Sequence, residues 1–145
     1  MIGLLQRVTN ASVNVDDQLI AQIERGLLVF VAVHRDDAER DIHRLGERIL
    51  SYRVFPDDEG RMNLNVQQAS GGLLLVPQFT LAADTRKGTR ASFTKGAAPD
   101  KAAAYFDKLV AGCRAQLDTV ETGQFGADMQ VALVNDGPVT FWLES

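Results

Sequence analysis

The strongest constraint on the fold is an uninterrupted apolar run that follows Gly26 and extends from Leu27 to Val33. The run is rich in branched side chains and has no polar position that could face water, so it predicts a strand covered on both faces. A second apolar stretch, from Leu73 to Val76, predicts another buried strand. The fold must therefore enclose the centre of its sheet.

Shorter apolar stretches predict the remaining strands. Residues 2–9 form one of them, and the segments Ala11–Val15 and Gln18–Ile23 suggest a hairpin that turns at Asp16-Asp17. Three more strands are expected toward the end of the chain, near 117–121, 129–134 and 139–143.

Two segments carry a helical period. From Asp36 to about Tyr52, apolar residues recur at helical spacing and acids crowd the first turn, where they favour the helix dipole. A second helix is expected to begin near Pro99, because proline is suited to the first turn of a helix. The residues expected to face the core are Ala38, Ile42, Leu45 and Ile49 in the first helix, and Ala102, Phe106, Leu109 and Cys113 in the second.

Strands interspersed with two helices predict an α+β fold, in which a curved, mostly antiparallel or mixed, barrel-like sheet carries the two main helices on one side. The chain lacks strict β-α-β-α alternation, a GxGxxG motif and a P-loop, which disfavours a doubly wound nucleotide-binding sheet. At 145 residues, 46% of them hydrophobic, the chain has the size of one domain, and no repeat or linker divides it. We therefore expect a single domain over residues 1–145.

The start of the sequence and its hydropathy predict a cytoplasmic protein without membrane contact. Gln6 and Arg7 interrupt the apolar start before a signal peptide could develop, and no apolar run approaches about 20 residues, the length that spans a bilayer. Cys113 is the only cysteine, so the chain cannot form an internal disulfide, and we expect neither a metal site nor a cofactor. A buried place in the second helix is the expected role of Cys113.

The overall charge argues against a general nucleic-acid binder, since the net charge is −4 and the pI is about 5.1. A local exception lies between Asp84 and Gly96, where four basic residues and one acid give a net charge of +3. Such a patch can steer a phosphate backbone even on an acidic molecule. On charge alone, an ordinary solvated loop is the favoured alternative.

The residue types available for catalysis are restricted. The chain has two histidines, His34 and His43, and no GxSxG motif, so a Ser-His-Asp triad is difficult to build. The adjacent acids at 36–37 and 57–58 lie in a helix start and in a turn expected at 56–60, where a solvated role is typical. An enzyme built on this chain must therefore work with hydroxyl, amide and backbone groups.

Two short segments follow predicted buried strands and are expected to form the rim of a site, Pro77–Leu81 and Asn135–Thr140. Backbone N–H groups in Gln78-Phe79-Thr80 could be aimed at a developing oxyanion, where one such donor is worth about 3–4 kcal/mol of barrier. Thr80 could act as a nucleophile, but no neighbour in the sequence is an evident base. Alternatively, Phe79 and Leu81 are core residues, and the polar residues beside them only pair with backbone.

These segments resemble the signature motifs of the D-aminoacyl-tRNA deacylases, and the resemblance runs the length of the chain. The one departure is Pro77, which stands where the family usually carries Ser. Activity is expected to survive this change if the amides of Phe79 and Thr80 stabilise the transition state. The resemblance is carried by Gln6-Arg7-Val8, Met62-Asn63-Leu64-Asn65-Val66, the segment 77–81 and the stretch from Gly123 to Trp142.

The resemblance implies hydrolysis of the ester in D-aminoacyl-tRNA at the 3′-terminal adenosine, with the adjacent ribose hydroxyl and an oriented water assisting. It implies that Gln78, Phe79 and Thr80 are the catalytic residues and that Gly137-Pro138 forms a cis peptide bond. In the family this dipeptide enters the active site of the other subunit of a homodimer, where its carbonyls hold the α-amino group and a wall excludes L side chains. Glycine has no side chain to exclude, so mischarged glycyl-tRNA is expected to be a further substrate.

By the same resemblance, further residues contact the substrate. Phe125 and Met129 are expected to pack around the terminal adenine, and a core role is the alternative for both. Arg7 is expected close to the Gly-Pro wall, and Asn135 is assigned to substrate binding. Two other classes of function stay open: a non-catalytic RNA-end or small-molecule binding module, and a structural dimerisation domain.

Overall fold

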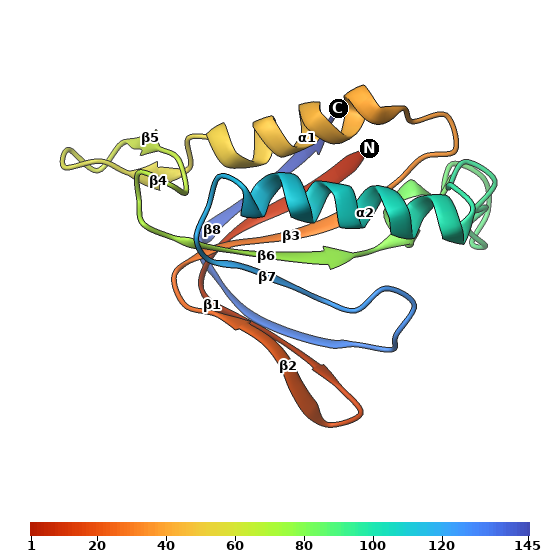
Figure 1. Ribbon diagram of the computed structural model, residues 1–145, viewed down its shortest axis with the longest axis horizontal. Coiled ribbons are helices and arrows are strands. Elements are labelled where there is room, and N and C mark those ends of the chain that lie inside the picture. Colours follow the sequence, from red (N-terminus) through yellow and green to blue (C-terminus); the bar gives the residue numbers. More distant parts are fainter.

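The long apolar run forms β3 (Gly26–Ala32), which lies inside the sheet between β1 (Ile2–Val15) and β6 (Gly72–Pro77) (Figure 1). The computed structural model describes all residues from 1 to 145. Side chains of β3 alternate between two buried clusters. Leu27 and Val29 join the large cluster beneath the helices, whereas Leu28 joins a second cluster whose buried members all lie on strands. Both faces of β3 are therefore covered, as the sequence predicts.

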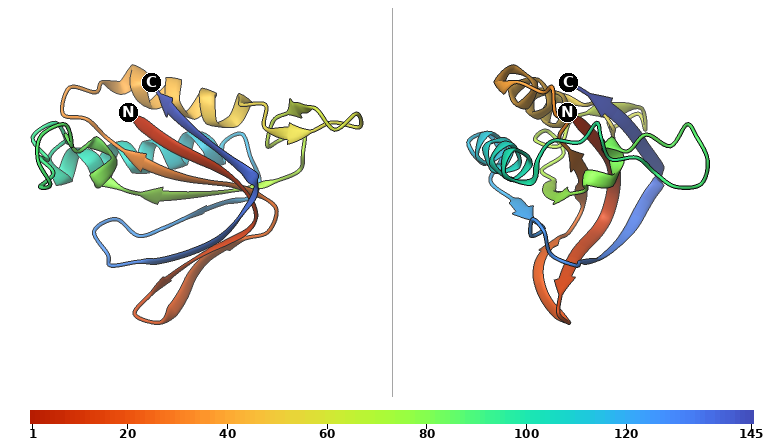
Figure 2. Two further views of the ribbon diagram at one scale, coloured as in Figure 1. Left: turned by 180° about the vertical axis from the view of Figure 1, so that it is seen from behind. Right: turned by 90° about the vertical axis from the view of Figure 1, so that its right-hand side faces the viewer.

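The sheet is mixed, because β3, β6 and β7 (Val120–Thr122) run parallel while β1 pairs antiparallel with all its neighbours. The strand order is β2-β1-β3-β6-β7, and β8 pairs with β1 outside this path. The sheet curves strongly and nearly closes into a barrel-like shape (Figure 2). The predicted α+β fold class, with a barrel-like sheet in one domain, is confirmed.

The predicted hairpin joins the C-terminal half of β1 to β2 (Gln18–Ile23). Its two turn residues, Asp16 and Asp17, both have positive φ, at 49° and 61°. Two central residues with positive φ are typical of the tight turn whose twist matches that of antiparallel strands, and Asp tolerates this conformation better than most residues. The predicted turn position is therefore confirmed.

Two expectations about the strands are wrong. Residues 2–9 and 11–15 are predicted as separate segments, but they form one continuous strand, β1. The sequence predicts two strands separated by Asn135–Pro138, but residues Gln130–Glu144 form one strand of 15 residues, β8. Both flanks of β8 pair with β1, from Gln130 opposite Asn14 to Glu144 opposite Ile2. Because β8 pairs with β1 both before and after Gly137-Pro138, the strand stays continuous, although Gly and Pro usually interrupt strands.

The two predicted helices are α1 (Glu39–Ser51) and α2 (Pro99–Arg114), and both cover the same side of the sheet (Figures 1 and 2). The helix α1 begins three residues later than predicted, because the Asp37 carboxylate accepts hydrogen bonds from the Met1 ammonium and the His34 amide. All the core residues predicted for α2 are buried, Cys113 included. Neither helix is long and apolar enough to cross a membrane.

A small hairpin of β4 (Phe55–Pro56) and β5 (Met62–Leu64) surrounds the turn predicted at 56–60. It lies at one end of the long axis of the molecule, whereas the segment 84–96 lies at the other end (Figure 1). These two ends share no strand pairing.

Candidate functional site

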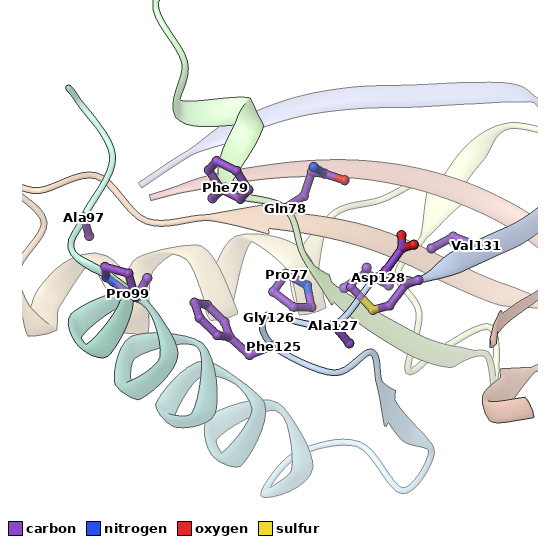
Figure 3. A pocket seen from close by; sticks show the side chains of 13 residues that line it. Pro77, Gln78, Phe79, Ala97, Pro99, Phe125, Gly126, Ala127, Asp128 and Val131 are labelled. Carbon is purple, nitrogen blue, oxygen red and sulfur yellow. The ribbon is translucent and has the colours of Figure 1, made fainter. Parts of the chain in front are cut away.

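A cavity of about 520 Å³ lies at the carboxyl end of β6, between α2 and the loop that joins β7 to β8 (Figure 3). Ligands in sheets with parallel strands commonly bind outside the carboxyl ends of those strands, so this position is a natural site. The lining is mostly apolar. It includes four of the predicted site residues, Gln78, Phe79, Phe125 and Met129, together with Pro77 and Asp128.

The first rim segment turns out of β6 into a short 3-10 helix, η1 (Phe79–Ala82). The Gln78 amide still belongs to the sheet, since it donates to the Val31 carbonyl oxygen at 2.7 Å. The amides of Phe79 and Thr80 come next, at the N-terminus of η1, where a 3-10 helix offers its first N–H groups no acceptor of its own. Of these two residues, Phe79 lines the cavity, whereas Thr80, next to it in the chain, does not.

The side chains of the same segment lie in the open. Phe79 is 63% exposed, so the alternative in which it is a core residue is wrong. Leu81, by contrast, packs against a small buried cluster. The Gln78 side-chain amide donates to the Thr80 hydroxyl oxygen at 2.5 Å, which ties Thr80 to a residue of the cavity lining. The lining of the cavity contains one acid, Asp128, and neither histidine nor lysine, so it offers no such base to activate the Thr80 hydroxyl.

Two residues of the β7–β8 connection close the cavity on another side. Phe125 is 37% exposed and lies against the cavity, facing the end of β6 and the start of α2 (Figure 3). The Met129 sulphur accepts a hydrogen bond from the Gln124 amide at 3.3 Å. This sulphur also limits the space at Gly123, where a Cβ atom would lie 2.9 Å from it. The loop is thus braced by its own residues, which keeps the Phe125 ring at the cavity.

The second rim segment is a bulge within β8. Gln6 pairs with Thr140 and Val8 with Asn135, so the four residues 136–139 of β8 stand opposite the single residue Arg7 of β1. The bulge carries the Gly137–Pro138 peptide bond, which is cis, and both of these residues are exposed. None of the bulge residues lines the cavity of the same chain. The two rim segments therefore form two separate features of one subunit.

Two side chains hold the bulge. Arg7 donates from Nε to the Asp136 carbonyl oxygen at 3.1 Å and from Nη1 to the Val54 carbonyl oxygen at 2.6 Å. Asn135 accepts from the Val139 amide at 3.1 Å and donates to the Thr140 hydroxyl oxygen at 2.9 Å. Arg7 lies close to Gly137 as expected, and the Asn135 side chain closes the base of the bulge.

The sequence did not single out Asp128, which lines the cavity, or Phe93, which packs on a lining residue. Asp128 lies within the Gly123–Trp142 stretch, where its polarity among apolar and glycine neighbours was the available signal. Phe93 packs on Phe79 with ring centroids 5.2 Å apart, a contact across 14 positions that no local pattern reveals. No group of three His, Cys, Asp or Glu side chains is arranged to hold a metal ion.

The fold and the cavity define a class of small single-domain α+β proteins with a mostly apolar pocket that contains an aromatic ring and no histidine. Comparison with known proteins narrows this class. The family model described as D-Tyr-tRNA(Tyr) deacylase matches residues 4–144, and the chain belongs to this family.

Individual relatives agree with this assignment. The D-aminoacyl-tRNA deacylases of Klebsiella pneumoniae (strain 342) and Escherichia coli O1:K1 / APEC are 60% and 59% identical over 144 residues, covering 99% of this chain and of each relative. A solved structure titled c-Myc DNA Unwinding Element Binding Protein matches with a TM-score of 0.96 at 34% identity, over 100% of this chain and 99% of that one. A probable eukaryotic D-amino acid tRNA deacylase shares the fold, with a TM-score of 0.83 at 19% identity, over 99% of this chain and 98% of that one.

Proposed function

We propose that the protein hydrolyses the ester that links a D-amino acid to the 3′-terminal adenosine of tRNA. The observation that carries this proposal is that Phe79, at the N-terminus of η1, lines the cavity with Thr80 next to it in the chain, in a protein that belongs to the deacylase family. The cavity volume of about 520 Å³ falls within the range of small-ligand pockets. Phe125 offers an aromatic face for the adenine base.

The proposed reaction is hydrolysis by water. Water adds to the ester carbonyl carbon, the carbonyl oxygen becomes an oxyanion, and the Phe79 and Thr80 amides donate to it. The carbon–oxygen bond to the ribose then breaks, the ribose oxygen leaves as a hydroxyl after gaining a proton, and the amino acid leaves as the free acid. The adjacent ribose hydroxyl orients the water and relays the proton, so the protein needs no side-chain base.

Selection of the D isomer is assigned to the bulge at 136–139. The carbonyls of Gly137 and Pro138 hold the α-amino group, and the bulge blocks the position that an L side chain would occupy. Arg7 and Asn135 hold the bulge from behind, so it can act as a fixed wall. A glycyl ester has no side chain to be blocked, and glycyl-tRNA is therefore a second substrate.

The wall must come from another subunit, because the bulge does not line the cavity of its own chain. We propose a homodimer in which each Gly137-Pro138 enters the cavity of the partner. Support comes from β8, which pairs with β1 only and leaves its other edge unpaired over 15 residues. Val134 and Trp142, on either side of the bulge, are 52% and 50% exposed. A long apolar edge strand is a typical surface for association.

A comparison of esters tests the activity. Purified protein is expected to release D-Tyr from D-Tyr-tRNA and glycine from glycyl-tRNA, and to leave L-Tyr-tRNA intact. Equal rates on the D and L esters, or no release from the D ester, would contradict the proposal. A D-Tyr-tRNA whose terminal 2′-hydroxyl is replaced by hydrogen is expected to be hydrolysed far more slowly. Undiminished hydrolysis would instead indicate that the Thr80 hydroxyl is the candidate nucleophile.

Subunit mixing tests the shared site. A cavity variant, Phe79→Pro, which removes one of the two proposed amide donors, and a bulge variant, Gly137→Val, are each expected to be inactive. After joint unfolding and refolding, half of the dimers are mixed and each contains one intact site, so about a quarter of wild-type activity is expected to return. No recovery would show that cavity and bulge act within one chain. A molar mass of one chain, measured by light scattering, would exclude the dimer.

The non-catalytic alternative predicts tight binding of the tRNA 3′ end without turnover. The same ester assay separates the two, because a binding module protects the D ester whereas the enzyme consumes it over many turnovers. A purely structural dimerisation domain predicts neither tRNA binding nor ester release.

A further inference from the structure

We propose that the segment 84–96, here called the basic loop, binds the phosphate backbone of the tRNA acceptor end beside the cavity. This inference rests on the proposed function, because it concerns how that substrate reaches the same site. The loop carries a net charge of +3 on a chain whose net charge is −4, so it stands out electrostatically from the rest of the molecule.

Both ends of the basic loop are attached to the cavity wall. The loop begins two residues after η1, which carries Phe79, and Ala97 directly after the loop lines the cavity as well (Figure 3). Phe93 inside the loop packs on the Phe79 ring at 5.2 Å. The Ala97 amide donates to the Val33 carbonyl oxygen at 2.9 Å, which ties the exit of the loop to the end of β3. A tRNA whose last nucleoside fills the cavity must therefore pass close to this loop on one side.

The base of the loop has a defined geometry. The Asp84 and Ser92 amides donate to each other's carbonyl oxygens at 2.7 and 3.0 Å. The Asp84 carboxylate pairs with the Arg86 guanidinium and lies 3.4 Å from Lys95 Nζ. The hydrogen bonds from Arg86 hold the pKa of Asp84 well below its usual range. The carboxylate therefore stays charged near neutral pH and keeps the base of the loop closed.

The tip of the loop carries the free charge. Lys87 and Arg90 are exposed and take part in none of the ion pairs of the structure. Gly88, between them, has a φ of 67° and open space around it, as expected for a turn that projects into solvent. The right-hand view of Figure 2 shows the loop projecting away from the rest of the chain. Two cations without an ion-pair partner, on a loop that follows the cavity wall, can bind the phosphates of a nucleic acid.

The hollow next to the cavity is less favourable for a polyanion. A second hollow of about 530 Å³ begins on the far side of Phe125, and its lining includes the Asp107 carboxylate and Arg114. The Arg114 guanidinium is engaged, since Nε and Nη2 both lie 3.3 Å from the Val120 carbonyl oxygen. Charge thus directs the acceptor strand toward the basic loop.

The dependence of activity on salt tests this assignment. We compare Lys87→Gln, Arg90→Gln and the double variant with wild type, measuring kcat/KM on D-Tyr-tRNA from 50 to 200 mM salt. Each lost phosphate contact flattens the slope of log(kcat/KM) against log[salt] by about 0.7–0.9, so the double variant loses about 1.4–1.8. The advantage of wild type then shrinks about tenfold across this range of salt. Asp84→Asn, which frees Arg86 and Lys95, is expected to steepen the slope.

The control is Arg61→Gln, which removes one exposed positive charge, paired with Glu59, at the opposite end of the molecule (Figure 1). It is expected to keep the wild-type slope. The ester of D-Tyr with adenosine alone has no acceptor stem, so the loop variants are expected to hydrolyse it as fast as wild type does. A slower reaction of the variants on this small ester would overturn the assignment, because it would place the loop in the cavity chemistry.

Two further results would overturn it. One is a double variant that keeps the wild-type salt slope, and the other is Arg114→Gln flattening the slope where the loop variants do not. Binding of uncharged tRNA over the same range of salt gives a readout that needs no catalysis. If wild type fails to hydrolyse D-Tyr-tRNA but the loop variants still weaken tRNA binding, the proposed function is wrong, whereas the proposed binding of tRNA by the basic loop is supported.

Discussion

Arg7 and Asp136 are joined mainly through the backbone of Asp136. Arg7 Nε donates to its carbonyl oxygen at 3.1 Å and lies 3.2 Å from its Oδ2, while Arg7 itself is 11% exposed and the Asp136 side chain 42% exposed. The buried partner thus grips the main chain of the bulge, and the exposed carboxylate adds little because water screens it.

This asymmetry predicts different outcomes for the two partners. Arg7→Gln removes charged hydrogen bonds to the carbonyls of Asp136 and Val54, and we expect the free energy of unfolding to fall by about 2–4 kcal/mol. Asp136→Asn keeps the carbonyl and is expected to lower it by less than about 1 kcal/mol. Urea unfolding of both variants measures the difference, and equal losses would show that the carboxylate carries the contact. Arg7→Gln is also expected to raise hydrolysis of L-Tyr-tRNA relative to the D ester, because the wall is less firmly held.

Two glycines with positive φ form a matched pair. At Gly137, with a φ of 132°, a Cβ atom would lie 2.7 Å from Val139 Cγ2, whereas Gly126, with a φ of 76°, has open space around it. Gly126→Ala is expected to cost about 1 kcal/mol of stability, for backbone strain alone. Gly137→Ala is expected to lower the free energy of unfolding by about 1–3 kcal/mol more than Gly126→Ala does, because the bulge must also shift. Thermal unfolding decides, and similar losses at the two sites would contradict the close packing of the bulge.

The Phe125 ring is expected to contribute stacking to substrate binding. Phe125→Leu keeps an apolar side chain without a ring, and we expect kcat/KM on D-Tyr-tRNA to fall about 5- to 150-fold, which corresponds to 1–3 kcal/mol. Phe125→Tyr retains the ring and is expected to stay within about threefold of wild type. Far-ultraviolet circular dichroism checks that both variants are folded. If both lose the same activity, Phe125 acts through packing of the loop and not through stacking.

Pro77→Ser is expected to change hydrolysis by less than about tenfold, because the proposed oxyanion donors are the amides of Phe79 and Thr80. Pro77 is the last residue of β6 and lies beyond the pairing with β7, which ends at Leu75. The missing N–H group therefore leaves no gap in the β6–β7 ladder. A change of several orders of magnitude on D-Tyr-tRNA would assign a direct role to a hydroxyl at this position.

Cys113 is expected to be inert in the folded protein. It is fully buried in α2, and burial raises the pKa of its thiol from 9.0 to about 11. Because the folded pKa is the higher one, the stability that the neutral thiol contributes is complete below pH 9 and declines as the pH rises through 11. By pH 11 the free energy of unfolding of the wild type is expected to fall by about 2–3 kcal/mol more than that of Cys113→Ala, which has no thiol to ionise. Urea unfolding at pH 8 and pH 11 measures it, and rapid labelling of the native thiol by an aromatic disulfide at pH 8 would contradict the burial.

Local pattern was sufficient for much of the fold. The apolar run at β3, the hairpin at Asp16-Asp17 and the core face of α2 depend on side-chain spacing and on turn residues that are neighbours in the chain. The unbroken strand β8 was not predictable in this way, because Asn135, Gly137 and Pro138 read locally as a strand end. Its continuity comes from β1, whose partners lie more than 100 positions away.

The same division applies to the site. The sequence by itself determined which groups were available: two rim segments, a histidine-poor composition and a basic loop, all of which follow from residue identity. Only the tertiary structure decided that Gln78, Phe79 and Phe125 share one cavity, whereas the Gly137-Pro138 bulge does not line it. The physical reason is that a cavity forms where β6, α2 and the β7–β8 loop pack together, and such packing depends on pairing between distant segments that no local spacing records.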